Sequence, residues 1–185
     1  MARAAIEQLI YLLHEAFEGN GEHSLLANLR NLPNDDLRWV PESGNRFAFE
    51  ILEHVGECKY VYENHAFGDG SMRWDRPGSI PSVGTEATKD EIIAWLRAGQ
   101  RRLKESLAAL DDDSELLARR RANWGQAYET RWLISVMIEH DLYHGGEINH
   151  IRALRQRNDA WAHPRPTSAA PPPPATPRGP NAGSA

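Results

Sequence analysis

The sequence contains very little cysteine and no long apolar run. Cys58 is the single cysteine in 185 residues, so the chain can form no intramolecular disulfide and has no zinc motif built on cysteine pairs. No stretch of 18 apolar residues occurs, and the chain does not open on a charged flank followed by an apolar signal segment. These absences predict a protein of the reducing cytoplasm without a membrane partner.

The chain also has no net positive charge. The chain has 21 Lys and Arg against 26 Asp and Glu, which gives a formal net charge of −5. This balance does not favour a nucleic-acid partner. The local basic runs at 101–104 and 119–121 lie close to acidic stretches such as 111–113, and we interpret these runs as solvated helix faces.

Proline is concentrated in the last part of the chain. Residues 163–185 hold eight of the 12 prolines, including a run of four from Pro171 to Pro174, and no apolar residue larger than alanine. A segment of this composition buries too little surface to offset the entropy of ordering it. We therefore predict a disordered Pro/Ala-rich tail over 163–185, locally polyproline II, after a folded domain over 1–160.

The folded part shows helical periodicity and no strand alternation of useful length. Apolar residues recur at helical spacing in four long segments. Thr88 and Glu91 have the spacing of a capping box at the start of the third segment. The pattern predicts an all-α fold, a four-helix bundle. The expected helices cover about residues 6–32 with a break at 19–21, then 46–65, 88–110 and 128–157, with a short helical piece at 114–123.

Three histidines are predicted to face the same bundle interior. His140 and His144 are four residues apart and share one helix face with Met137 and Ile151, while His54 lies on the apolar stripe of the second predicted helix. Each buried imidazole needs partners for both ring nitrogens, or it loses about 1–3 kcal/mol for each unmet group. One divalent cation satisfies one nitrogen of each ring, and imidazole suits Zn, Ni and Fe. The alternative for each histidine is a core residue hydrogen-bonded to a neighbour.

Other polar residues fall near this predicted metal site. Glu147 lies one turn beyond His144 and is a candidate fourth ligand, hydrogen-bond partner of an imidazole, or proton-transfer group, with pairing to an arginine as the alternative. Cys58 follows His54 by one turn and is expected to be a small core residue that could also approach the metal. His23 follows the glycine break and is a candidate to border the site.

Three segments of the chain resemble the DinB-like superfamily, whose members include YfiT-like metal-dependent hydrolases and thiol-dependent transferases. The segments read AFEGNGEHSLLANLRNL, FEILEHVGECKYVYENHAFGDG and MIEHDLYHGGEINHIRALRQ, and the resemblance spans about residues 3–157. It implies that His54, His140 and His144 are metal ligands. It further implies a small-molecule substrate, a low-molecular-weight thiol as a candidate second cofactor, and a homodimer. Many members carry Gln at the position of Glu147 and Trp at that of Glu22, so the substrate class does not transfer.

Rival interpretations use the same residues differently. His140, His144 and His150 have the spacing of metzincin proteases, but Asp141 and Glu147 stand where those enzymes need Glu and Gly. A di-iron bundle needs two Glu-x-x-His motifs, and only one occurs. A non-catalytic metal-binding or stress-response protein with a structural metal stays open. Three neutral ligands favour the enzyme, because they leave open positions on the metal.

Overall fold

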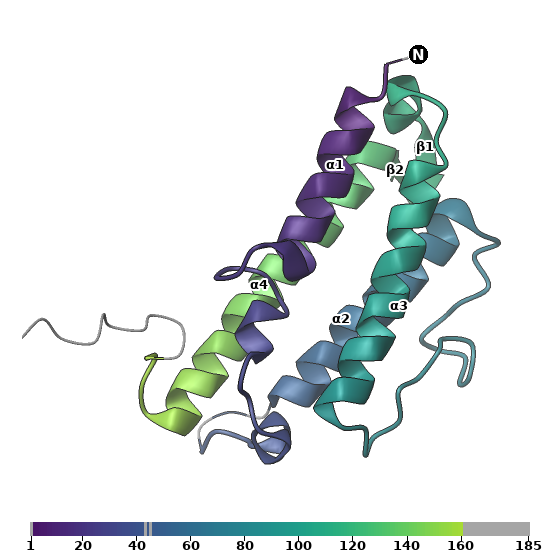
Figure 1. Ribbon diagram of the computed structural model, residues 1–185. Helices are drawn as coiled ribbons and strands as arrows, with labels where there is room; N and C mark the ends of the chain where they lie inside the picture. The colour runs from purple at the N-terminus through teal and green to yellow at the C-terminus, as the bar shows by residue number, and fades with distance from the viewer. Residues whose placement is uncertain (1, 43, 45, 161–185) are drawn as a thin grey trace, which may run out of the picture.

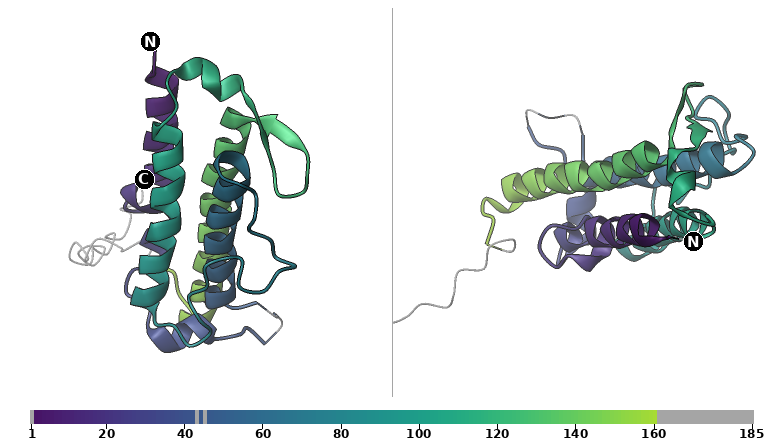
Figure 2. Two further views of the ribbon diagram at one scale, coloured as in Figure 1. Left: turned by 90° about the vertical axis from the view of Figure 1, so that its right-hand side faces the viewer. Right: turned by 90° about the horizontal axis from the view of Figure 1, so that it is seen from above.

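Four long helices form a bundle in the computed structural model, which describes residues 2–42, 44 and 46–160 (Figure 1). The helices are α1 (Ala4–His14), α2 (Ala48–Phe67), α3 (Lys89–Ala108) and α4 (Thr130–Gln156). α2 packs against both α3 and α4, and α1 packs against the same two helices. Figure 2 shows the result as two layers, α1 with α3 and α2 with α4. The predicted four-helix bundle is confirmed.

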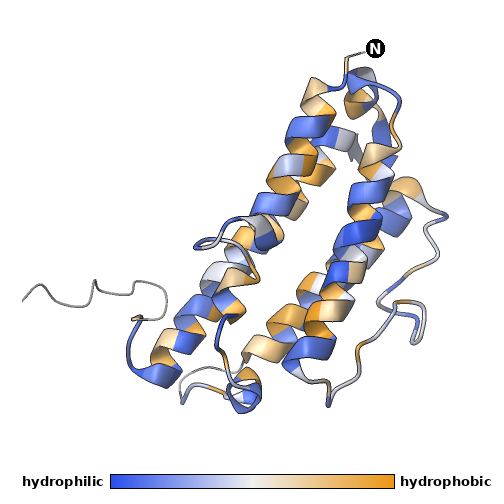
Figure 3. Cartoon of the chain, in the orientation of Figure 1, coloured by the Kyte–Doolittle hydropathy of each residue, from blue (hydrophilic) through white to orange (hydrophobic). Residues whose placement is uncertain are grey.

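The core consists of two groups of buried apolar side chains, one towards each end of the bundle. The first group includes Leu52, Val55 and Leu96, and the second includes Leu103 and Met137. Hydrophobic and hydrophilic residues alternate around each helix in Figure 3, as amphipathic helices require. Each helix therefore buries one stripe, and the interior has a boundary between two apolar regions where polar groups can lie.

The start of α3 follows the predicted capping box. The hydroxyl of Thr88 accepts the backbone N–H of Glu91 at 3.4 Å, and the carboxylate of Glu91 accepts the backbone N–H of Thr88 at 2.8 Å. Two of the amides that a helix start leaves without partners are satisfied in this way.

The predicted continuation of the first helix through Leu25, Leu29 and Leu32 is wrong. α1 ends at His14, a π-helical turn covers Glu15–Gly19, and the only helical piece that follows before residue 33 is a 3-10 turn at Ala27–Leu29. The side chain of Asn20 accepts the backbone N–H groups of residues 22 and 23 at 2.9 and 2.8 Å. This local turn competes with the helical hydrogen bonds. The three leucines are nevertheless buried, because the turns fold back onto the core.

The predicted helical piece at 114–123 is also wrong over most of its length. A 3-10 helix covers Asp113–Leu117, and a hairpin follows in which β1 (Arg119–Arg121) pairs antiparallel with β2 (Ala127–Glu129), with Arg120 opposite Tyr128. Gly125 turns the chain with a φ of +89°, a conformation that favours glycine. The basic run 119–121 therefore lies on a strand and not on a helix face.

Two further expectations concern the ends of the chain and membranes. The predicted tail at 163–185 lies outside the described residues. Among those described, no helix combines the length and the apolar character needed to cross a membrane.

Candidate metal centre

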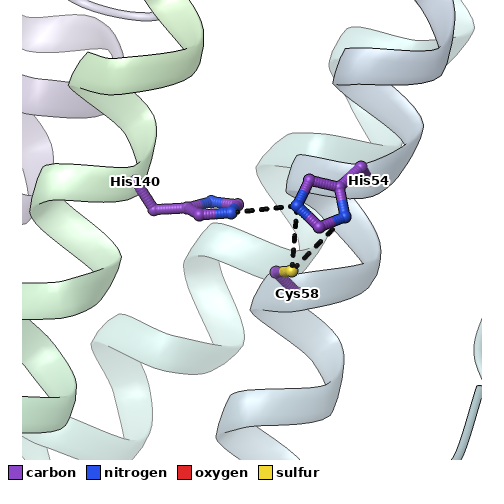
Figure 4. A group of neighbouring side chains, drawn as sticks. All are labelled: His54, Cys58 and His140. Atoms are coloured by element: carbon purple, nitrogen blue, oxygen red, sulfur yellow. Dashed lines mark hydrogen bonds between the residues drawn. The ribbon is translucent and has the colours of Figure 1, made fainter.

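The three predicted ligand histidines come together between α2 and α4. The Nε2 atom of His140 lies 3.2 Å from Nε2 of His54 and 3.1 Å from Nε2 of His144. Figure 4 shows His140 on α4 facing His54 on α2. Nitrogens bound about 2.0–2.1 Å from one tetrahedral zinc ion lie about 3.3 Å from one another. The two spacings that involve His140 therefore fit nitrogens bound to one metal ion, and the rings of His54 and His144 lie 5.1 Å apart between their centroids.

Burial favours the neutral form of two of these imidazoles, those of His140 and His54, by lowering their pKa. It lowers the pKa of His140 to about 3, and the neighbouring His144 and His54 lower it further in the same direction. Burial likewise lowers the pKa of His54, with the proximity of His144 as the next cause. A neutral imidazole has one free nitrogen lone pair, which is the form that binds metals.

Glu147 determines which nitrogen of His144 faces its neighbours. The Oε2 atom of Glu147 lies 2.5 Å from Nδ1 of His144, so the carboxylate accepts the Nδ1–H and the lone pair remains on Nε2. The other oxygen of Glu147 lies 3.6 Å from the guanidinium of Arg46. Glu147 therefore contacts both an imidazole and an arginine, which the sequence had left as alternatives.

With the proton of His144 on Nδ1, the three facing Nε2 atoms cannot all be paired by N–H donors of the same three rings. Because Nε2 of His144 is an acceptor, His140 can donate its Nε2–H to it. That single N–H then cannot serve His54 as well, whose Nε2 lies 3.2 Å away, and the other donor near His54 is the weak S–H of Cys58 at 3.8 Å. A cation shared by the three lone pairs satisfies all of them at once.

Cys58 adds a sulfur atom to the cluster. Its side chain is buried, and its Sγ lies 3.8 Å from both ring nitrogens of His54. The ligand atoms of His54, Cys58 and His140 all lie within 4.8 Å of one another, a spacing that could hold a metal ion. Burial, and next the charge of Glu57, raise the pKa of the thiol to about 12. Cys58 is thus a small buried residue and a neighbour of the site, as the sequence indicated, and it is a thiol at neutral pH.

A buried ion pair lies directly beside the cluster. The ammonium of Lys59 donates to the carboxylate of Asp141 at 2.7 Å and to the side-chain oxygen of Gln100 at 2.8 Å, and the amide of Gln100 donates to the carbonyl of Leu13 at 2.8 Å. The side chains of Lys59 and Asp141 are each only 1% exposed. The network links all four helices at the boundary between the two apolar groups. Burial raises the pKa of the Asp141 carboxyl, and the adjacent Lys59 opposes that shift.

The sequence indicates burial for only one partner of this ion pair, Asp141. Asp141 follows Met137 by four residues and precedes Ile148 by seven, so the helical period places it on the buried stripe. Lys59 has no such signal, since it lies off the stripe that contains His54 and Cys58. The pair is therefore absent from the residues predicted for the site.

Two other histidines lie away from the cluster. The side chain of His23 is 70% exposed and lies 3.9 Å from the carboxylate of Glu22, and none of the contacts found among the described residues joins it to the other three histidines. His150 is exposed, as predicted. α4 continues without a break to Gln156, so the chain does not make the turn by which a metzincin brings in its third histidine.

Comparison with known proteins places this arrangement in a family. No curated protein matches the chain. The family model of the DinB superfamily matches residues 20–148, which is more than half of the chain and includes all three clustered histidines. With this match over most of a helical bundle, the chain belongs to the DinB superfamily.

Proposed function

We propose that the protein binds one divalent metal ion through His54, His140 and His144 and uses it to transform a small molecule. The reaction is either a hydrolysis or a transfer that involves a low-molecular-weight thiol. The observation that supports this proposal most strongly is the approach of Nε2 of His140 to within 3.1 Å of Nε2 of His144 and 3.2 Å of Nε2 of His54. Bound there, Zn, Ni or Fe supplies a Lewis acid with coordination positions that the histidines leave open.

The histidines are better ligands here than Cys58. The rings of His54 and His140 are already in the neutral, metal-binding form, because burial lowers their pKa. The Cys58 thiol must first lose a proton whose pKa burial raises to about 12. Glu147 assists His144 by holding its proton on Nδ1, and its carboxylate is a candidate to move a proton to or from a substrate.

Metal analysis of histidine variants tests the ligand set. His54→Ala and His144→Ala should each abolish stoichiometric binding of added Zn or Ni, whereas His150→Ala, a matched exposed histidine on α4, should bind as the unaltered protein does. Full occupancy in His54→Ala would exclude the proposed ligands. Turnover screens with and without added low-molecular-weight thiols then separate a hydrolase from a thiol transferase.

A non-catalytic metal-binding or stress-response protein is the second candidate. It is favoured by one observation, the position of the buried Cys58 sulfur within 4.8 Å of two of the histidine ligand atoms. With Cys58 as a fourth ligand the site would be closed, as structural zinc sites are.

The spectrum of the Co(II)-substituted protein distinguishes the two candidates. An open three-histidine site should change its visible spectrum when imidazole or a thiol is added, and should show no sulfur-to-cobalt charge-transfer band beforehand. A closed site should ignore the added ligands and show that band, and Cys58→Ala should remove it. The homodimer that the family resemblance implies stays a prediction.

A further inference from the structure

The two adjacent glycines in the middle of α4 differ in what surrounds them. A Cβ atom added at Gly145 would lie 3.3 Å from the side-chain nitrogen of Asn28 and 3.6 Å from Cα of Leu25, so the close approach of the N-terminal segment accounts for that glycine. A Cβ added at Gly146 would meet nothing within 4 Å, and the backbone there is ordinary helix. Glycine inside a helix costs about 1 kcal/mol relative to alanine. Neither packing nor backbone geometry explains that cost at Gly146.

The space beside Gly146 is an open depression of about 430 Å³. Buried Ile51 and partly buried Ile151 contribute apolar surface to it, and charged groups come from Arg46 and Glu147. It also includes Tyr143, Gly146 and His150. A mostly apolar depression with a few polar groups is the usual form of a small-molecule site.

The depression adjoins the histidine cluster. Glu147 belongs to both, because its carboxylate accepts the Nδ1–H of His144. The ring of Tyr143 lies 5.0 Å from the ring of His144, and Ile51 precedes His54 on α2 by about one turn. A molecule in the depression would therefore contact Glu147, which bridges it to the Nδ1 edge of His144, and would lie about one turn of α2 from His54.

The charges of the site favour an anion. Imidazole binds metals in its neutral form, so three histidine ligands leave the charge of a divalent ion uncompensated, and the opposite charges of Arg46 and Glu147 cancel each other. The net local charge with metal bound is positive, which attracts a negatively charged ligand.

We propose that this depression, kept open by Gly146, is the substrate subsite of the metal centre and takes a small organic carboxylate with a compact apolar body. The apolar body packs against Ile51 and Ile151, and the carboxylate faces Arg46 and the metal. This inference rests on the proposed function, since the metal provides the net positive charge.

The test uses the full-length protein loaded with Co(II), whose visible spectrum is titrated with phenylacetate and with acetate. Phenylacetate should bind the unaltered protein at least tenfold more tightly than acetate. Gly146→Leu should keep one Co(II) per chain and an equal or higher melting temperature, and should lose that preference without losing acetate binding. The control is Glu139→Leu, which places the same side chain on the same face of α4 seven residues earlier, at an exposed position outside the depression. It should retain the preference.

A second variant tests the charge. Arg46→Met should weaken phenylacetate binding and leave the binding of uncharged imidazole unchanged. If Co(II) binds but phenylacetate is not preferred, or if Gly146→Leu retains the preference, the subsite is wrong while the metal proposal stands. If Co(II) does not bind stoichiometrically, the proposed function fails and the subsite fails with it.

Discussion

At the scale of single residues, burial shifts the pKa of His54, His140 and Cys58 in the histidine cluster. The pKa of His140 falls to about 3 and that of the Cys58 thiol rises to about 12, in both cases chiefly because burial penalises the charged form. Both shifts keep the group neutral. The cluster therefore carries lone pairs and little charge, which is the state in which a cation is best accepted.

The lowered pKa of His140 predicts a pH dependence of stability in the metal-free protein. In the unfolded chain this imidazole takes up a proton near its ordinary pKa of 6.5, whereas in the folded protein it stays neutral down to about pH 3. The unfolded state thus binds more protons between these values, so the free energy of unfolding falls as the pH falls through this window. The slope from this residue is up to about 1.4 kcal/mol per pH unit.

Urea denaturation in the presence of a chelator, between about pH 6.5 and pH 4.5, measures this slope. His140→Gln should show a smaller slope than the unaltered protein. Parallel slopes would mean that His140 is protonated in the folded state and is not buried as described.

At the scale of elements, α2 and α3 pack closely because a glycine faces a tryptophan. A Cβ atom at Gly56 would lie 2.0 Å from the ring of Trp95, so the ring occupies the space that any side chain would need. The packing of α2 against α3 therefore requires a glycine at position 56, whereas no neighbour within 4 Å requires a glycine at position 146 of α4.

The same substitution should consequently have opposite effects at the two glycines. Gly56→Ala should lower the free energy of unfolding by about 1–3 kcal/mol through overpacking against Trp95. Gly146→Ala should raise it by up to about 1 kcal/mol through helix propensity alone. Chemical denaturation of both variants measures the difference, and a destabilised Gly146→Ala would show that the glycine has a structural role.

The Lys59–Asp141 pair joins α2 to α4 and predicts a double-mutant result. Removing either partner leaves a buried charge unpaired, so Lys59→Met or Asp141→Leu alone should cost about 3–5 kcal/mol. The double variant should recover most of that loss, because apolar groups of similar volume replace both charges. Equal losses in the double and single variants, measured by urea unfolding, would show that the pair does not interact.

At the scale of the whole molecule, the sequence predicts the parts of the fold that local periodicity controls. α2, α3 and α4 lie within a few residues of their predicted bounds, because their apolar residues repeat at helical spacing and the capping box starts α3. Leu25, Leu29 and Leu32 have the same spacing, but the side chain of Asn20 forms a turn that interrupts the helix.

Local periodicity does not predict contacts between residues far apart in the sequence, or strands of only a few residues. Each strand of the hairpin has three residues, too few for an alternating pattern to be recognised. Buried Lys59 has its partners Asp141 and Gln100 at 82 and 41 positions away in the sequence, and no local pattern encodes such partners. For the candidate site, the order of His54, His140 and His144 predicts convergence, and the structure brings the three rings together. For Glu147, the sequence does not decide between a metal ligand, a hydrogen-bond partner of an imidazole, a proton-transfer group and a partner of an arginine.

The Pro-rich tail leads to a prediction for the whole chain. The composition of 163–185 offers no side chains for a core, so truncation after Ala162 should leave the melting temperature and the metal content unchanged. Calorimetry and elemental analysis of the truncated and full-length proteins provide the comparison. A fall in melting temperature of more than a few degrees would indicate that the tail docks on the bundle.

The order of the helices along the chain has a consequence for how the protein is made. His54 and His140 are separated by 86 positions, and α4 is the last helix of the bundle. While the ribosome is still adding α3, the nascent chain has a single histidine of the three, and one imidazole holds a divalent ion only weakly. If His54, His140 and His144 are the ligands, as proposed, tight binding of a metal ion requires that α4 be synthesised and docked against α2. With the proposed ligand set, metallation is therefore expected late in biogenesis, on a folded bundle and not on an emerging polypeptide.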